Sequence, residues 1–147
     1  MLEQQLKLAL SLFLMLTLTM ISKAESLDYI KKHSQLAINE MNVSGIPASI
    51  KLAQAILESA WGRSDAATLY NSHFGIKCKD WRGDSFRKVD DDFDAQGNLI
   101  KSCFRAYLNT EQSFKDHSEF LSKSARYRVL FTYDKTDYVN WAIGLQQ

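Results

Sequence analysis

The segment PASIKLAQAILESAWG, residues 47–62, decides how this chain folds because it carries the strongest helix pattern in the sequence. Alanine and leucine, which favour helix interiors, dominate it. Its apolar residues recur at helical spacing and predict one buried stripe. The stripe is expected to contain Ile50, Ala53, Ile56 and Leu57. Pro47 suits a first helical turn and Gly62 suits the residue beyond the last one, so the helix should end near Trp61.

Two further helices are expected on either side of this one. Residues 27–41 place apolar residues between charged ones with the spacing of an amphipathic helix. After the central helix, Ser64 is a good capping residue and Asp65 suits the first turn of a short helix reaching Tyr70. The first half of the folded chain is therefore predicted to be helical.

The middle of the chain changes to a β pattern. Residues 74–78, 85–89 and 99–108 are rich in β-branched and aromatic residues. The turn sequences RGD at 82–84 and QGN at 96–98 lie between them. This pattern predicts a small antiparallel hairpin or a three-stranded lobe.

Helices return towards the C-terminus. Thr110 opens a helix-start sequence that leads to Ser124, and a last helix is expected from about Asp137. The side chains expected on one side of that last helix are Tyr138, Trp141, Ala142 and Leu145. The fold class predicted from these patterns is α+β, with a mostly helical body and a small antiparallel β lobe.

The first 24 residues have the pattern of a secretory signal peptide. Lys7 precedes the uncharged run 8–21, and Ser22-Lys23-Ala24 puts small residues before a cleavage point at Glu25. The run is shorter than the ~20 residues of a spanning helix, which argues against an uncleaved signal anchor. We therefore expect a signal peptide over 1–24, one domain over 25–147, and export to the periplasm or cell surface without a stable membrane anchor.

Charge argues against a nucleic-acid partner. Residues 1–24 hold two lysines and one glutamate, so residues 25–147 have 16 basic and 16 acidic residues and a formal charge of zero. Nucleic-acid binders usually carry a basic excess on one face. Short mixed runs such as residues 77–80 indicate solvated surface instead, and the chain is expected to act as a monomer.

Two cysteines, Cys78 and Cys103, invite a disulfide in an oxidising compartment. Both lie in strand-like segments that a hairpin would bring together, although two buried free thiols are the alternative. A zinc site formed with His73 and His117 is disfavoured because no closely spaced Cys or His pair supports it. We expect no metal and no cofactor.

Glu58 is the most informative polar residue. It follows an apolar run and lies three residues before Trp61, which would place both on one helix face. The negative end of the helix dipole and an apolar ring would both favour the protonated carboxylic acid. Glycosidases need such an acid to protonate the leaving oxygen. An exposed glutamate paired with Arg63 or Lys51 is the alternative interpretation.

Six segments of this chain resemble, in the right order, motifs of the glucosaminidases of glycoside hydrolase family 73. That family includes autolysins and the wall-cutting domain of the flagellar rod-cap protein. The segments are LAQAILESAWGRS (52–64), NSHFGIK (71–77), FRAY (104–107), SFKDH (113–117), ARY (125–127) and WAIGLQ (141–146).

The resemblance implies a lysozyme-like fold and an endo-β-N-acetylglucosaminidase, a secreted hydrolase that cuts peptidoglycan after N-acetylglucosamine. Glu58 matches the general acid of the family. The second acidic residue of the family is usually a Glu before an aromatic residue, and this chain has three aspartates there. Asp92, followed by Phe93, is the best match and Asp91 is the next, while a hydrated acidic turn is the alternative. A substrate-assisted route would need neither.

Several rings are expected to bind sugars or to belong to the core. Trp61, Phe74 and Tyr107 could stack on sugar faces, and Tyr127 matches a family position near the cleft. Asn71 opens the second family motif and is a further substrate-binding candidate. The sequence lacks the family's later Gly-Tyr-Ala-Thr-Asp segment, so the domain is expected to be truncated at its C-terminus.

Two other functions remain open at this point. A non-catalytic peptidoglycan-binding module would fit the missing segment and the Asp in place of Glu. A lytic transglycosylase or muramidase also uses one Glu on a core helix, but no Gly-Leu-Met-Gln-type motif follows Glu58.

Overall fold

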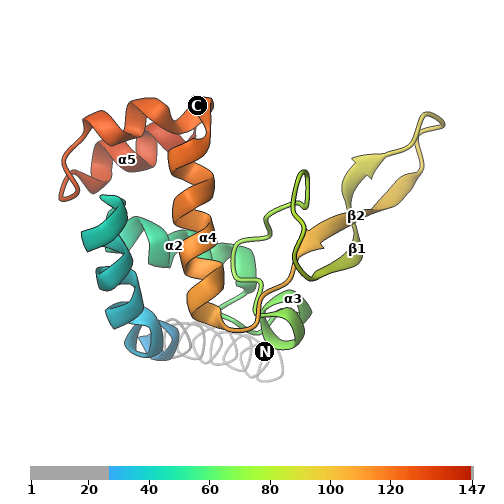
Figure 1. Ribbon diagram of the computed structural model, residues 1–147, viewed down its shortest axis with the longest axis horizontal. Coiled ribbons are helices and arrows are strands. Elements are labelled where there is room, and N and C mark those ends of the chain that lie inside the picture. The colour runs from blue at the N-terminus through green and yellow to red at the C-terminus, as the bar shows by residue number, and fades with distance from the viewer. Residues whose placement is uncertain (1–26, 147) are drawn as a thin grey trace, which may run out of the picture.

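The computed structural model describes residues 27–146, and the expected signal peptide over 1–24 lies outside them (Figure 1). The chain forms a helical body from which one small β hairpin projects (Figure 1). The predicted α+β class is therefore confirmed. None of the helices in the described part has the length and hydrophobicity needed to cross a membrane.

The helical body is built from both ends of the described chain. Residues 27–44 are helical and lead into α2 (Ala48–Ser59). After the hairpin come α4 (Thr110–Lys123), the 3-10 helix η1 (Ala125–Thr132) and α5 (Tyr138–Leu145). The 3-10 helix packs against both α4 and α5, and α5 in turn contacts α2. Segments distant in sequence thus surround the central helix α2.

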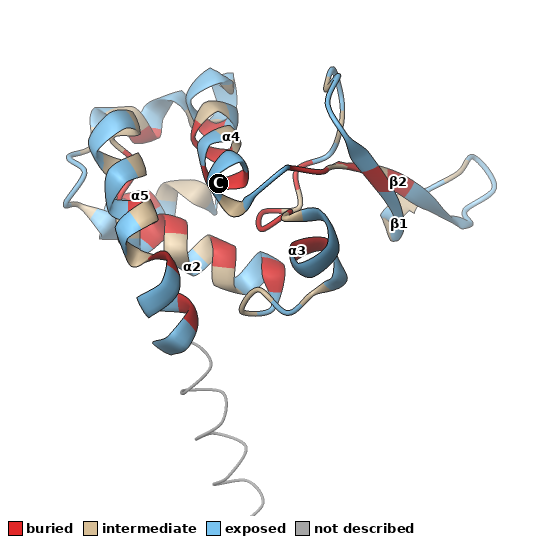
Figure 2. Cartoon of the chain, turned by 60° about the horizontal axis from the view of Figure 1, so that its bottom comes forward, coloured by how far each residue is buried: buried red, intermediate tan, exposed pale blue. Residues whose placement is uncertain are grey.

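Two buried clusters hold this body together, and red segments mark the facing sides of the helices in Figure 2. The first contains Tyr29, Ala37, Ala55, Phe74, Ile76 and Phe114. The second contains Ile46, Ile50, Leu121, Leu130 and Trp141. A smaller cluster of Ala66, Phe86, Phe104 and Ala106 joins the hairpin to α3.

The predicted buried stripe of α2 is only partly right. Ile50 is buried, but Ala53 is exposed and Leu57 is 80% exposed. The buried face instead contains Lys51 and the small residues Ala55 and Ser59. Small side chains let neighbouring elements approach this face closely. The ammonium group of Lys51 is fully hydrogen-bonded. The face is therefore buried although it is less apolar than the predicted stripe.

The end of α2 also differs from the prediction. The helix ends at Ser59, because Ala60, Trp61 and Gly62 all have positive φ values of 49°, 58° and 77°. The chain therefore turns away from the helix axis, and Trp61 does not continue the face that carries Glu58. A Cβ at Gly62 would lie 2.8 Å from the Tyr29 ring, so this turn requires glycine.

The short helix α3 (Asp65–Tyr70) forms as predicted. The Ser64 side chain accepts a hydrogen bond from the Ala67 amide, and Asp65 lies in the first turn. At its other end, Asn71 takes a left-handed conformation with φ of 50°. This conformation directs the chain back towards the hairpin.

The β lobe is a two-stranded antiparallel sheet of β1 (Ser85–Phe93) and β2 (Leu99–Arg105). Residues 74–78 contribute only one isolated bridge, between Lys77 and Phe104, so no third strand forms. The pairing register is irregular between Val89 and Phe93, where the three aspartates lie. The predicted Cys78–Cys103 disulfide is present, with Cα atoms 5.4 Å apart, and it fixes the preceding loop to β2.

The last helix begins as expected, since the Asp137 side chain accepts a hydrogen bond from the Asn140 amide. Trp141 is fully buried and Leu145 half-buried. Tyr138 and Ala142 are exposed, which corrects the expectation that they share the buried side. The helix packs against η1 and α2, and Trp141 carries this contact as part of the second buried cluster.

Candidate active site

A cleft of about 860 Å³ lies between α2, α4 and the loop that follows Phe74. Gln54 and Glu58 reach it from α2, and Phe74 and His117 contribute to its buried surface. Its other lining side chains include Lys77, Trp81, Arg105, Asp116, Phe120 and Tyr127. Carboxylates and aromatic rings therefore face one volume large enough for sugar units.

Glu58 lies where this cleft meets a second hollow. The second hollow, here called the β1 hollow, has a volume of about 290 Å³, is also lined by Gly75 and Lys77, and extends to Asp90 and Asp91 on β1. Glu58 belongs to the last turn of α2 and its side chain is exposed. Gly75 has φ of 57°, and a Cβ there would lie 3.8 Å from Oε2 of Glu58. Glycine thus leaves open space beside the carboxylate.

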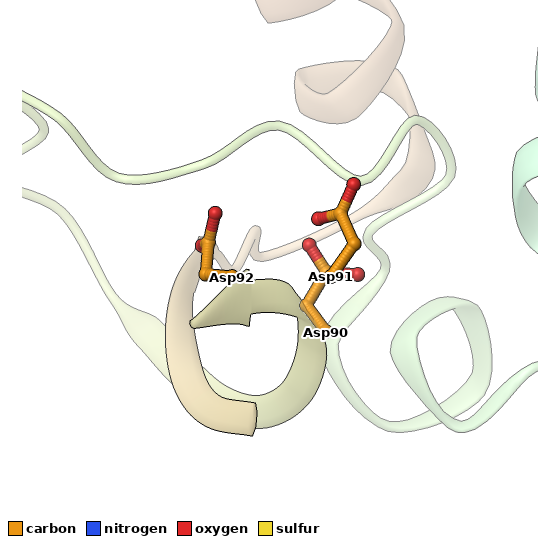
Figure 3. Close-up of side chains that lie close together, drawn as sticks. All are labelled: Asp90, Asp91 and Asp92. Carbon is orange, nitrogen blue, oxygen red and sulfur yellow. The ribbon is translucent and has the colours of Figure 1, made fainter. Parts of the chain in front are cut away.

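The aspartates of β1 surround one lysine. Figure 3 shows their side chains where they leave the curved strand, and their carboxylate oxygens lie within 4.8 Å of one another. Nζ of Lys77 lies 3.1 Å from Asp90, 3.4 Å from Asp91 and 2.7 Å from Asp92. These hydrogen bonds raise the pKa of Lys77. The ammonium group therefore supplies the positive charge that this acidic cluster needs.

Asp92 and Asp91, the two candidates for the second acidic residue, differ in their surroundings. Asp92 accepts hydrogen bonds from Lys77 and from the Ser102 hydroxyl, and these bonds lower the pKa of Asp92. Its side chain does not line either hollow. Asp91 lines the hollow next to Glu58, and its side chain is 87% exposed. Of the two, Asp91 is the carboxylate that shares a space with Glu58.

A hydrogen-bonded wall closes the side of the cleft next to the disulfide. Nε1 of Trp81 donates to the Asp84 carbonyl over 2.8 Å, and the Arg105 guanidinium lies 5.0 Å from the Trp81 ring. Nη1 of Arg105 contacts both oxygens of Asp116 at 2.9 Å. The Tyr107 hydroxyl donates to Asp116 over 2.7 Å. These contacts hold the Trp81 ring at the cleft.

The expected sugar-binding residues divide into two groups. Phe74 and Tyr127 line the cleft together with Glu58. Trp61 and Asn71 line a separate hollow of about 480 Å³ beside His33 and His73. Tyr107 is 7% exposed and does not line the cleft, and burial together with Asp116 raises its pKa.

Asn71 has a clear backbone role, because its amide donates to the carbonyls of Tyr107 and Leu108. The cleft residues that the sequence analysis did not select include Gln54, Lys77, Trp81, Arg105 and His117. Gln54 could have been found from the sequence, since it lies four residues before Glu58 on the same helix face. The others depend on how loops and α4 approach α2.

Comparisons with known proteins show the family to which the chain belongs. Residues 34–147 match the Glucosaminidase family model, described as mannosyl-glycoprotein endo-beta-N-acetylglucosaminidase. The chain is 37% identical over 92 residues to the peptidoglycan hydrolase FlgJ of Pseudomonas aeruginosa, covering 57% of this chain and 22% of that protein. It is 33% identical over 94 residues to the exo-glucosaminidase LytG of Bacillus subtilis, covering 63% and 32%.

Among solved structures, the glycoside hydrolase domain of Salmonella typhimurium FlgJ is similar to this chain with a TM-score of 0.62 and 25% identity. The match covers 82% of this chain and 74% of that one. The matches to the curated relatives span about a third or less of those proteins' length.

Proposed function

The chain belongs to the glucosaminidase family, and from this premise we propose that it is a peptidoglycan hydrolase. We propose that it cleaves the β-1,4 bond after N-acetylglucosamine within glycan strands. The observation that carries the proposal is the position of Glu58, at the end of the central helix and at the junction of the cleft and the β1 hollow.

Glu58 is proposed to act as the general acid. Glycosidases of both stereochemical classes need one carboxylic acid that protonates the oxygen of the leaving sugar. The protonated group can then donate its proton to the glycosidic oxygen as the bond to the leaving sugar breaks.

Asp91 is proposed as the second carboxylate. It lines the β1 hollow together with Glu58, and its contact with Lys77 is the longest of the three, at 3.4 Å. A carboxylate there can activate a water molecule or stabilise the positive charge that develops on the sugar ring. Asp92 is proposed instead to hold Lys77 in place. If the substrate's own acetamido group attacks, neither aspartate is needed as a nucleophile or base.

Aromatic side chains on both sides of the cleft support sugar binding. Trp81 lies on the loop side and Tyr127 at the start of η1. Flat apolar rings stack well on the faces of sugars. We further propose that the protein acts as a monomer outside the cytoplasm, in the periplasm or at the cell surface. The Cys78–Cys103 disulfide supports this location because such bonds persist in oxidising compartments.

Mass spectrometry of digested peptidoglycan tests this proposal. Purified walls incubated with the protein should yield fragments with new reducing N-acetylglucosamine ends, over a range of strand lengths. Release of single sugars alone would indicate cleavage from strand ends. Anhydro-muramic ends would indicate a lytic transglycosylase, and intact strands would indicate a binding module. Each of these three results contradicts the proposal as stated.

A further inference from the structure

Two polar side chains of the cleft have hydrogen-bonding capacity that no other group in the described part of the chain uses. The first is Gln54, one helical turn before Glu58 on the same face of α2. Within the described residues, its buried Oε1 has no hydrogen-bond partner. A buried amide oxygen without a hydrogen-bond partner is energetically unfavourable. Because the last torsion of a glutamine side chain is soft, this amide can rotate to meet a ligand in the cleft.

The second is His117, which is 4% exposed and stacks on Phe74 with ring centroids 3.9 Å apart. Nδ1 of His117 lies 3.4 Å from Nζ of the fully buried Lys51. The lysine nitrogen also donates to the Phe114 carbonyl over 2.9 Å and to the Ser118 hydroxyl over 2.5 Å. All three of its hydrogens are thereby engaged.

The contact with Lys51 determines the protonation of His117. A lysine ammonium group has only donors, so Nδ1 must accept and the proton of a neutral ring must be on Nε2. Burial, and then the charge of Lys51, lower the pKa of His117 well below its ordinary value. The ring is therefore neutral near pH 7. Since Nδ1 faces the core and the ring lines the cleft, Nε2–H is the donor left for a ligand.

From this pair we infer that Gln54 and His117 bind the acetamido group of an N-acetylated amino sugar. Oε1 of Gln54 would accept the acetamide N–H, and Nε2–H of His117 would donate to the acetamide carbonyl. Phe74, stacked on His117, offers an apolar surface to the methyl group. The inference rests on the proposed function, because it assigns specificity within the same cleft. It makes N-acetylation a requirement for tight binding.

Lys51 acts in this scheme as a positioning residue. It does not line the cleft, but its contact with Nδ1 on the buried side of the ring fixes the tautomer of His117. The Ser118 hydroxyl that receives its hydrogen bond donates in turn to Glu40 over 2.5 Å. The chain Glu40–Ser118–Lys51 thus ties the helix over 27–44, α4 and α2 together beneath the cleft floor.

Binding measurements on a Glu58→Gln protein test the inference without turnover. The ligands are soluble peptidoglycan glycan strands, the same strands after chemical N-deacetylation, and strands that have then been re-acetylated. We expect the N-acetylated and re-acetylated strands to bind at least about tenfold more tightly than the deacetylated ones. Adding Gln54→Leu should remove about tenfold of that affinity and leave binding of deacetylated strands unchanged. Gln35→Leu, the same change at an exposed glutamine outside the cleft, is the matched control.

Two substitutions separate the functions of the His117 nitrogens. His117→Asn keeps an acceptor near the Nδ1 position for Lys51 but removes the donor at Nε2, so it should lose the preference for N-acetylated strands. His117→Gln places an amide N–H near the Nε2 position and should retain part of it. Thermal melts show whether the His117 variants fold. If they do not, the effect of Gln54→Leu on the preference for N-acetylated strands still tests the inference.

The inference is overturned if Gln54→Leu and folded His117→Asn keep the full preference, if they weaken binding of both strand types equally, or if no strand binds. Wall digestion by the protein with Glu58 intact tests the proposed function separately. A protein that prefers N-acetylated strands through Gln54 and His117 but cuts no wall would keep the inference and remove the hydrolase assignment.

Discussion

Nζ of Lys77 lies 2.7 Å from Oδ2 of Asp92, while its distance to Oδ1 of Asp91 is 3.4 Å. The shorter contact, together with the Ser102 hydroxyl, engages the Asp92 carboxylate. Asp91 is more exposed and lines the hollow that it shares with Glu58. The two neighbouring aspartates should therefore respond differently to the same substitution.

Asp91→Asn is expected to lower the turnover of peptidoglycan at least about tenfold, because a general base contributes roughly 10²–10⁴-fold to such reactions. Asp92→Asn should cost less than about threefold, because it changes only the support of Lys77. Turnover numbers on purified wall, with melts of both variants, make the comparison. Similar small losses in both would favour the substrate-assisted route, and a larger loss in Asp92→Asn would contradict the assignment of Asp91.

Asp116→Asn should destabilise the fold by about 2–4 kcal/mol. Asp116 accepts from both Arg105 and Tyr107, and its side chain is 13% exposed, so the substitution removes the negative charge that pairs with Arg105 in a largely buried place. Glu119→Gln is the matched control, because it breaks an exposed ion pair with Lys123 at 2.7 Å. The control should change stability by less than about 1 kcal/mol. Equal urea-unfolding midpoints for the two variants would contradict this.

Removing the disulfide should lower the free energy of unfolding by about 3.5 kcal/mol in the chain-entropy model, since the bridged cysteines are 25 residues apart. The Cys78→Ala/Cys103→Ala protein should melt well below the oxidised parent. The parent treated with a reductant should melt close to that double variant. If all three samples melt at the same temperature, the bridge contributes nothing to stability.

Stability should fall as the pH decreases from about 6.5 to about 4. Burial, and then the charges of His33 and Lys32, lower the pKa of His73 to about 4. The unfolded chain binds a proton at this histidine below about 6.5 but the folded chain does not, so acid favours unfolding by up to about 3 kcal/mol from His73 alone.

His73→Asn provides the comparison for that pH dependence, because an asparagine amide can donate or accept and can keep a hydrogen bond with the Tyr29 hydroxyl, which lies 2.7 Å from Nδ1 of His73. The variant should show a smaller loss of stability between pH 6.5 and 4 than the parent in urea melts. Parallel pH profiles of the two proteins would show that His73 is not responsible.

The helices were predictable from local patterns because caps and apolar spacing agree with the final packing. Ser64 caps α3 as expected, and α5 begins next to Asp137 as expected, with the Asp137 side chain as its cap. Which face of α2 is buried was harder to predict. Leu57 is exposed and Lys51 buried, because the packing of α2 depends on small residues and on partners from α4 that are distant in sequence.

The site residues also divide into those that the sequence motifs predicted and those whose positions depend on distant packing. Glu58, Phe74 and Tyr127 lie in one cleft, as the family motifs imply. Trp61 is turned away by three successive left-handed residues, which no helix-spacing argument can anticipate. Tyr107 supports Asp116 from within the protein. Trp81 reaches the cleft because of its contacts with Asp84 and Arg105 across loops.

The central claim is that Glu58 donates the proton, and Glu58→Gln tests it most directly. Glutamine keeps the size of the side chain but cannot protonate a glycosidic oxygen, and Glu111→Gln at an exposed position outside the cleft is the matched control. The measurement is the rate at which new reducing ends appear on purified peptidoglycan, with a thermal melt and a wall-binding assay for each protein. We predict a loss of about 10²–10⁴-fold in cleavage for Glu58→Gln, with folding and wall binding retained and the control unchanged. A folded Glu58→Gln protein that cuts wall at the parent's rate would contradict the account.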